Sequence, residues 1–275
     1  MKFLFFGKII LKKMKKTNLI LIPMAGIGKR FKEANFNTLK PLVLVDNESI
    51  LEKSIKNLPT SKNKYIILNK NVFEKKKILR KILSKNKFKN FLIKNKTLGQ
   101  ADTINRIKFL FKDTDLEKDC LIHSCDYILK YNFNKFSKIA KESDVIVFVS
   151  KLKSKIINDY NSFAYCKMRN QNEVKKIVEK TTISKFPEND YVVVGSFWFK
   201  KLSDCFLSQD ISLKKNNTVN NEYYIGNNLN NLINLGKKVV IQEVDTWINL
   251  GDIFSYSEYI YWKNFFERNK DIKKC

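Results

Sequence analysis

Glycines and cations gather directly after the first apolar stretch of the chain, a combination of residue types that suits phosphate. The set lies in segment 18–42, NLILIPMAGIGKRFKEANFNTLKPL, and comprises Gly26, Gly28, Lys29, Arg30 and Lys40. Glycines let the backbone approach a ligand and point N–H groups at it, while the cations supply charge. At the carboxyl end of a first parallel strand, this predicts an anion site large enough for a triphosphate. A turn with a solvated basic face is the alternative.

The two common phosphate loops do not fit this segment. A Walker A loop requires G-x-x-x-x-G-K-[ST], but Arg30 follows Gly28-Lys29, and Pro23 stands at the position of the first glycine. A dinucleotide fingerprint requires G-x-G-x-x-G, and Phe31 replaces its third glycine. The loop is therefore predicted to be an anion loop of another kind.

The bulk composition limits the classes of protein. The chain has 275 residues, of which 44% are hydrophobic and 13% aromatic, enough for one large α/β domain or two small ones. The formal charge of +26 invites a nucleic-acid interpretation. However, the lysines are spread along the whole chain, and neither an RNP-like aromatic element nor a helix-turn-helix pattern occurs. We expect a lysine-rich solvated surface that favours anionic substrates, and no nucleic-acid partner.

The N-terminal segment and the cysteines indicate where in the cell the protein is expected to be. Residues 1–17 are interpreted as a basic extension, with an upstream start before Met14 and a weak membrane-surface helix as alternatives. No apolar run approaches the roughly 20 residues that span a bilayer. The five cysteines show no C-x-x-C spacing and the chain has one histidine, which argues against a zinc site. Free thiols fit a cytoplasmic protein.

Strand and helix patterns alternate in the first half. Strands are predicted at 18–23, 64–69, 88–94 and 119–124, and helices at 50–58, 73–83 and 101–111. This alternation is typical of a doubly wound α/β fold with a mostly parallel, Rossmann-like sheet.

The second half is richer in strands. Strands are predicted at 144–150, 163–169, 173–180, 191–199 and 237–244, with helices at 222–236 and 253–269. We therefore expect a mixed, β-rich second half. With no repeat or long linker, residues 18–268 are predicted to form one domain, with a nucleotide half at about 18–130 and an acceptor half at about 131–268.

Taken together, the motifs resemble the sugar-phosphate nucleotidyltransferases, which make NDP-sugars from an NTP and a sugar 1-phosphate. The family's G-x-G-x-R and K-P elements match GIGKR at 26–30 and Lys40-Pro41. Further matches follow in family order: TLGQADTI, IHSCDYIL, VKKIVEK, VVVGSFWF, NEYYIGNNLNNLINLGKKV and WINLGDIFSYSEY. The resemblance covers roughly 18–259 and is clearest to the branch serving capsule and surface-polysaccharide pathways, whose phosphorylated acceptors vary.

The resemblance implies a role for each matched position. The nucleotide would contact Met24, Ala25, Gly26, Gly28, Lys29, Arg30, Gly99 and Gln100. The acceptor would contact Glu179, Lys180, Gly195 and Glu222. The catalytic residues would be Arg30, Lys40 and Lys180. The metal, Mg²⁺, would be held by Asp126 and Asn249.

Some of these positions depart from the family or have plainer interpretations. Asn249 stands where the family has a second metal-binding Asp, and Asp252 nearby is a substitute ligand. Asp126 could instead cap a turn, and Glu222 could be the first-turn acid of its helix. His123 is expected to be a packed, hydrogen-bonded core residue.

The implied reaction is NMP transfer from an NTP to a sugar 1-phosphate or similar acceptor, with release of pyrophosphate. The attacking phosphate is already anionic at neutral pH, so no general base is required and charge screening dominates. A glycosyltransferase on the same core would need an Asp-x-Asp where the chain has only Asp126. The other alternative is a catalytically weak regulator that binds nucleotide. Asn249 supports this alternative because it stands where the family has a second metal-binding Asp. The base, the acceptor and the oligomeric state, homo-oligomer included, stay open.

Overall fold

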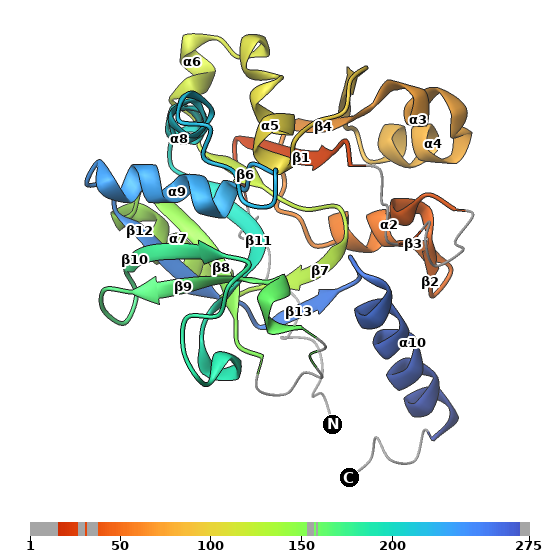
Figure 1. The fold of residues 1–275 in the computed structure, drawn as a ribbon. Coiled ribbons are helices and arrows are strands. Elements are labelled where there is room, and N and C mark those ends of the chain that lie inside the picture. Colours follow the sequence, from red (N-terminus) through yellow and green to blue (C-terminus); the bar gives the residue numbers. More distant parts are fainter. Residues whose placement is uncertain (1–15, 27–30, 32–37, 153–156, 158, 270–275) are drawn as a thin grey trace, which may run out of the picture.

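The protein is described by a computed structural model over residues 16–26, 31, 38–152, 157 and 159–269. Within these residues, nine strands form a central sheet whose main path runs β10-β9-β11-β6-β1-β4-β5, while β8 joins β11 to β12 (Figure 1). None of the described helices is both long and apolar enough to cross a bilayer.

The first half is a parallel sheet with helical connections, as predicted. Its strands are β1 (Leu19–Met24), β4 (Asn63–Asn69), β5 (Lys89–Ile93) and β6 (Cys120–Ile122). Its helices are α2 (Ile50–Ile55), α3 (Lys70–Lys75), α4 (Lys77–Lys85), α5 (Gln100–Asn105) and α6 (Asp113–Leu116). β1 pairs in parallel with β4 and β6, and all its residues are buried. The carboxyl ends of these strands therefore meet at one edge, where ligands bind in such sheets.

Two predicted helices are shorter than their patterns indicated. The predicted helix at 73–83 is two helices, because Lys76 between α3 and α4 has a non-helical backbone (φ −113°, ψ 88°). The predicted helix at 101–111 ends at Asn105 and is followed by a short 3₁₀ turn at Lys108–Leu110.

Over its described residues, the second half adds five strands to the same sheet, and the strand pairs that they form are antiparallel except for the parallel pair of the last strand with the first. They are β8 (Val145–Ser150), β9 (Ala164–Met168), β10 (Val174–Glu179), β11 (Val192–Phe199) and β12 (Val239–Glu243). β11 is antiparallel to β6 on one side and to β8 on the other, so it joins the two halves into one sheet. The helices here are α7 (Phe133–Glu142), α8 (Leu202–Lys214) and α9 (Ile225–Asn234), of which the sequence predicted only α9.

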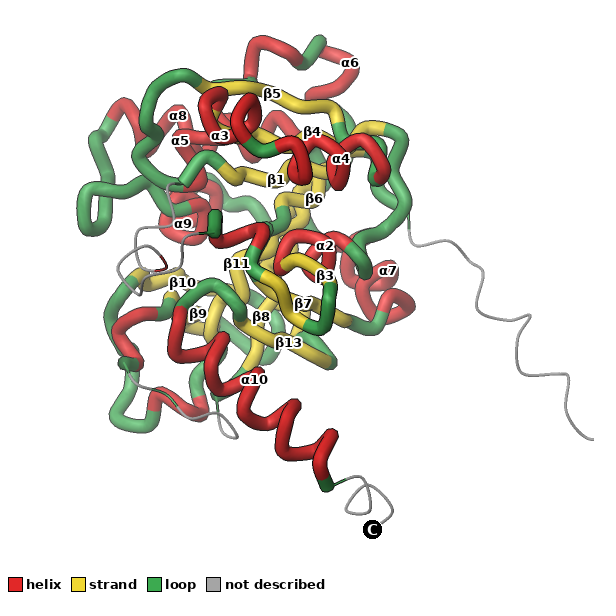
Figure 2. The backbone as a smooth tube through the Cα atoms, turned by 90° about the vertical axis from the view of Figure 1, so that its right-hand side faces the viewer, coloured by secondary structure: helices red, strands yellow, loops and turns green. Residues whose placement is uncertain are grey.

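Two short ribbons and a final helix complete the described structure. The elements are β2 (Leu44–Val45), β3 (Glu48–Ser49), β7 (Tyr127–Lys130), β13 (Thr246–Asn249) and α10 (Ile253–Arg268). β13 pairs antiparallel with β7, although the two strands are far apart in sequence. α10 runs outward beside β13 and the β2–β3 hairpin (Figure 2).

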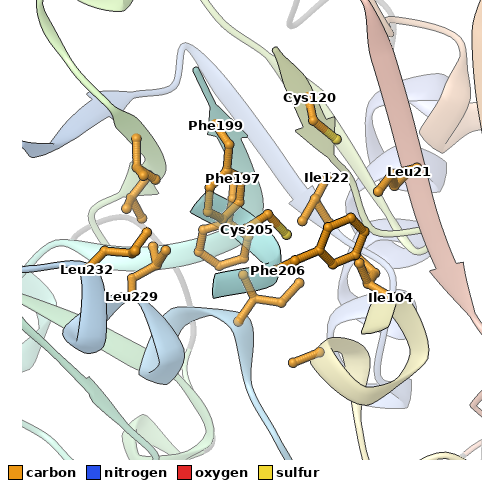
Figure 3. Packing of buried hydrophobic residues seen from close by; sticks show 14 of the residues in the cluster. Leu21, Ile104, Cys120, Ile122, Phe197, Phe199, Cys205, Phe206, Leu229 and Leu232 are labelled. Atoms are coloured by element: carbon orange, nitrogen blue, oxygen red, sulfur yellow. The ribbon is translucent and has the colours of Figure 1, made fainter. Parts of the chain in front are cut away.

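Apolar side chains pack on both faces of the sheet. Along β11, Phe197 and Phe199 belong to one core cluster, with Cys205 and Leu232 from α8 and α9 (Figure 3). Trp198, between them, belongs to the cluster on the opposite face, as the two-residue repeat of a strand requires. Four free cysteines are buried, Cys120, Cys125, Cys166 and Cys205.

Candidate functional site

The predicted anion loop begins where β1 ends. Met24 and Ala25 are buried there, whereas Gly26 is exposed and has open space at the position of a side chain. Gly28, Lys29 and Arg30 lie outside the described residues. The roles that the sequence predicts for these three residues therefore remain predictions.

Lys40, which follows that loop, contacts the residue predicted to hold the metal. Its Nζ lies 2.6 Å from Asp126 Oδ2 and donates to the Gly251 carbonyl at 3.2 Å. The other oxygen of Asp126 accepts a hydrogen bond from Ser124 Oγ. Burial raises the pKa of Asp126, but the Lys40 charge and these hydrogen bonds outweigh it, and the pKa is lowered overall. Asp126 is therefore an ionised carboxylate at neutral pH.

The β7–β13 ribbon brings Asn249 to the same place. The Leu250 N–H donates to the Asp126 carbonyl at 2.9 Å, and Asn249 Oδ1 accepts from the Gly251 N–H at 2.9 Å. A Cβ on Gly251 would lie 2.7 Å from Asp126 Oδ2 and 3.0 Å from Asn249 Oδ1. The two oxygens therefore face one small space, which only glycine leaves open. Sequence reasoning missed this role of Gly251.

Asp252 orients the Asn249 amide. It is the N-cap of α10, with Oδ1 accepting from the Ser255 N–H at 2.8 Å. Its Oδ2 accepts from Ser255 Oγ at 2.9 Å and from Asn249 Nδ2 at 2.7 Å. Because the amide nitrogen is bound to Asp252, the amide oxygen points toward Gly251. We therefore interpret Asp252 as a residue that positions Asn249 rather than as the substitute ligand.

This donor set suits a metal that also takes ligands from its substrate. Among the described residues, no three His, Cys, Asp or Glu side chains gather to form a metal site by themselves. Mg²⁺ usually takes one or two protein carboxylates and completes its shell with water and phosphate oxygens. One ionised carboxylate and one oriented amide oxygen, from Asp126 and Asn249, fit that requirement.

The second predicted nucleotide segment lies against the predicted acceptor segment. Gly99 has a φ of +96°, and a Cβ there would lie 2.7 Å from the Tyr223 carbonyl oxygen. The Tyr223 N–H in turn donates to the Leu98 carbonyl at 2.8 Å. These contacts place Gln100, the first residue of α5, and Glu222 on adjacent segments. Only glycine combines this φ with so close an approach.

Glu222 lies before its helix rather than in it. α9 begins at Ile225, with Tyr224 as its N-cap and no acid in its first turn. The interpretation of Glu222 as a first-turn acid is therefore wrong. Its side chain is exposed, and its role toward an acceptor stays a prediction.

Glu179 ends β10 in a confined place. A Cβ on Gly226 would lie 2.6 Å from Glu179 Oε1, so a side chain at the start of α9 would displace the Glu179 carboxylate from its observed position. Burial raises the pKa of Glu179 to about 7, against the lowering effects of the Lys180 charge and the Asn227 backbone N–H. Glu179 is thus partly protonated at neutral pH.

Lys180 is held by the segment before β9. It has a φ of +57°, and its N–H donates to the Phe163 carbonyl at 2.8 Å. Its Nζ donates to the Ser162 carbonyl and lies 5.6 Å from the ring centroid of Tyr224. Lys180, the residue after Glu179, is therefore held in place by these contacts, and its role toward the acceptor phosphate stays a prediction.

A buried polar network supports the end of β6. His123 is 2% exposed, with Nδ1 2.8 Å from Ser196 Oγ and Nε2 3.2 Å from Ser54 Oγ. Burial lowers its pKa to about 4, so the ring is neutral at pH 7. The prediction of a packed, hydrogen-bonded histidine is confirmed. The network itself, which ties β6 to α2 and β11, was not predicted.

Gly195 belongs to the same region. It has a φ of +95°, and a Cβ there would lie 3.5 Å from the Tyr127 ring. The Tyr127 hydroxyl is 2.6 Å from Ser196 Oγ and accepts from the Ser124 N–H at 3.2 Å. Because 3.5 Å is an ordinary contact distance, it is the positive φ that calls for glycine at position 195, and the predicted contact of Gly195 with the acceptor stays a prediction.

The comparisons with known proteins agree with this architecture. The family model for nucleotidyl transferases matches residues 18–262. The chain therefore belongs to the nucleotidyl transferase family, as the sequence motifs had indicated. No curated protein matches the sequence significantly.

Three solved structures share the fold at low sequence identity. A nucleoside-diphosphate-sugar pyrophosphorylase from Vibrio cholerae RC9 has a TM-score of 0.71 and 18% identity, covering 88% of this chain and 100% of its own. A UDP-glucose pyrophosphorylase complexed with UDP-glucose has a TM-score of 0.66 and 16% identity, covering 90% and 100%. The inositol-1-phosphate CTP transferase from T. maritima has a TM-score of 0.63 and 14% identity, covering 88% and 92%.

Proposed function

We propose that this chain moves an NMP group from an NTP to a sugar 1-phosphate or a similar phosphorylated acceptor and releases pyrophosphate. The observation that carries the proposal is the cluster of Lys40, Asp126 and Asn249 beside the end of β1, in a chain of the nucleotidyl transferase family. The printed names of its structural neighbours describe enzymes of nucleotide sugars and of inositol 1-phosphate, which favours acceptors of this chemical class.

In this reaction an oxygen of the acceptor phosphate forms a bond to the α-phosphorus, and the bond from that phosphorus to the pyrophosphate oxygen breaks. The protein has to hold two anions in line and screen the charge that develops. Lys40 would hold phosphate oxygens next to Asp126, and Lys180 would hold the acceptor phosphate beside Glu179. Arg30 would bind the triphosphate, since its planar fork matches phosphate oxygens.

Asp126 and Asn249 would hold Mg²⁺ in this proposal. The bound ion would neutralise phosphate charge and polarise the phosphoryl group. Asn249 brings an oxygen but no charge, so the free protein should hold the ion weakly and bind it mainly together with the nucleotide.

Two other functions remain candidates on the same fold. A glycosyltransferase would transfer the sugar without releasing pyrophosphate, and a nucleotide-binding regulator would bind nucleotide without turnover. Asn249 at a metal position favours the regulator over a glycosyltransferase, because it lowers the charge available for catalysis.

Pyrophosphate release separates these functions. Each of the four NTPs is incubated with a panel of phosphorylated acceptors and Mg²⁺, and pyrophosphate is measured. Turnover with at least one pair supports the proposal, whereas nucleotide binding without turnover supports the regulator. Lys40→Ala should lower kcat about 10²-fold, because a charged group is lost from a phosphate site. Lys70→Ala, a surface change on α3 that removes only an exposed ion pair with Glu74, is the matched control.

A further inference from the structure

A cavity of about 210 Å³ lies between β13, the first turns of α10 and the segment around Phe163. Four aromatic side chains and one carboxylate stand out in its lining: Phe163, Trp247, Tyr259, Trp262 and Glu258. Pockets for drug-sized ligands measure roughly 300–1,000 Å³. This cavity is therefore suited to a small head group.

The cavity adjoins the proposed reaction site on its acceptor side. Asn249, whose amide oxygen faces the space beside Asp126, is part of its wall. Phe163, on another wall, accepts a backbone hydrogen bond from Lys180 at 2.8 Å. A group in the cavity is thus bordered by Asn249, the predicted metal ligand. It is also bordered by Phe163, which is hydrogen-bonded to Lys180, the cation predicted to hold the acceptor phosphate.

Three polar side chains of the wall, those of Asn249, Ser255 and Tyr259, are already engaged with other groups. The Asn249 amide is held by Gly251 and Asp252, as described above, and Ser255 Oγ donates to Asp252 at 2.9 Å. The Tyr259 hydroxyl donates to Asp46 Oδ2 at 3.2 Å. A hydroxyl-rich sugar ring would find few partners here, and unpaired polar groups are costly to bury.

The rings and the carboxylate offer a different kind of binding. Phe163 and Trp247 stand nearly perpendicular, with centroids 6.1 Å apart at 79°. Trp247 is 9% exposed and Trp262 43%, so the cavity has a buried and an accessible side. Glu258 makes no hydrogen bond or ion pair with any residue that the structure describes. Ring faces with one negative charge are the surroundings that bind quaternary ammonium groups.

We propose that the acceptor is the phosphomonoester of a small alcohol with a quaternary ammonium group, whose cationic head occupies this cavity. The inference rests on the proposed function and narrows its substrate. The acceptor phosphate oxygen displaces pyrophosphate from the NTP, so the products are an NDP-linked ammonium alcohol and pyrophosphate. Glu258 faces the cationic head, and the aromatic rings surround it.

Phosphocholine is the probe, compared with phosphoethanolamine, glucose 1-phosphate and inositol 1-phosphate. We expect the highest kcat/KM with phosphocholine, at one preferred NTP. Glu258→Gln should raise the KM for phosphocholine about fivefold by removing the opposite charge, and Phe163→Leu about three- to thirtyfold by removing a ring face. Neither change should move the KM for the NTP. Glu267→Gln, on the same helix but paired with Lys263 outside the cavity, should leave both KM values unchanged.

Direct binding separates this inference from the proposed function. Phosphocholine is titrated by calorimetry into the wild type and both cavity variants, with and without NTP. Binding that Glu258→Gln and Phe163→Leu weaken, with no pyrophosphate release from any pair, would leave the cavity assignment standing and overturn the proposed function. Turnover with a sugar 1-phosphate and no phosphocholine binding would overturn the inference alone. Phosphocholine turnover that both cavity variants leave unchanged would also overturn it.

Discussion

Replacing Asn249 by aspartate tests how the reaction site is built. In the wild type, Asn249 Nδ2 donates to Asp252 Oδ2 at 2.7 Å. The Asn249→Asp variant replaces this donor by a carboxylate oxygen, with a second carboxylate, Asp126, across the space above Gly251. We therefore expect the change to destabilise the metal-free protein.

The magnitude follows from Coulomb's law. The new carboxylate at position 249 and that of Asp126 are taken to relax to a separation of about 4 Å. Their repulsion is then about 1 kcal/mol in a water-like medium and about 4 kcal/mol at an effective dielectric constant near 20. Both side chains are half-buried, so the free energy of unfolding should fall by an amount within that range. For a domain of this size, each kcal/mol lowers Tm by roughly 2–4 °C.

Mg²⁺ should reverse this loss. A second carboxylate attracts the ion more strongly than an amide oxygen does, so Asn249→Asp should tighten Mg²⁺ binding in the absence of nucleotide. At an Mg²⁺ concentration of about 100 times Kd, the bound ion would add about 2.7 kcal/mol of stability. Thermal unfolding with and without Mg²⁺ and calorimetric Mg²⁺ titration measure the two effects.

The exposed Asn217→Asp is the matched control, which should change neither quantity. If Asn249→Asp leaves both the stability and the Mg²⁺ affinity at wild-type values, Asn249 does not face Asp126 and Asp252 as described. The alignment of WINLGD with the family's metal element would then be wrong as well.

Two further predictions follow from the geometry. Gly251→Ala should lower turnover about 10²-fold, because its Cβ would lie 2.7 Å from Asp126 Oδ2 and displace that carboxylate; wild-type kcat in this variant would contradict the close approach. Because burial raises the pKa of Glu179 from 4.5 to about 7, the folded protein binds more protons than the unfolded chain between these pH values, and this group's contribution to stability falls as pH rises through that window. Glu179→Gln should remove that fall. Urea unfolding from pH 4.5 to 8 would detect this as a smaller loss of stability with rising pH than in the wild type. If the free energy of unfolding changes with pH equally in both proteins, Glu179 is not confined.

Much of the fold could be predicted because its local patterns agree with its tertiary structure. Continuous apolar runs such as that of β1 have one stable location, the interior of a parallel sheet. α8 escaped prediction for the opposite reason. Its buried face includes Asp204, Ser208, Gln209 and Ser212, so the hydrophobic repeat of a helix is missing. Asp204 is buried against Lys237, 2.9 Å away on a distant segment, a contact that no local pattern reveals.

The sequence by itself predicted which residues would carry chemistry, since glycines, cations and the Lys40-Pro41 pair after a buried strand are typical of a phosphate site. Only the tertiary structure decided which of them meet. The β7–β13 ribbon joins segments about 120 residues apart and thereby sets Asn249 beside Asp126. The same pairing, with α10 next to it, assembles Phe163, Trp247 and Glu258 around one cavity. Such long-range pairings depend on the packing of the whole sheet, so the spacing of residues along the chain does not encode them.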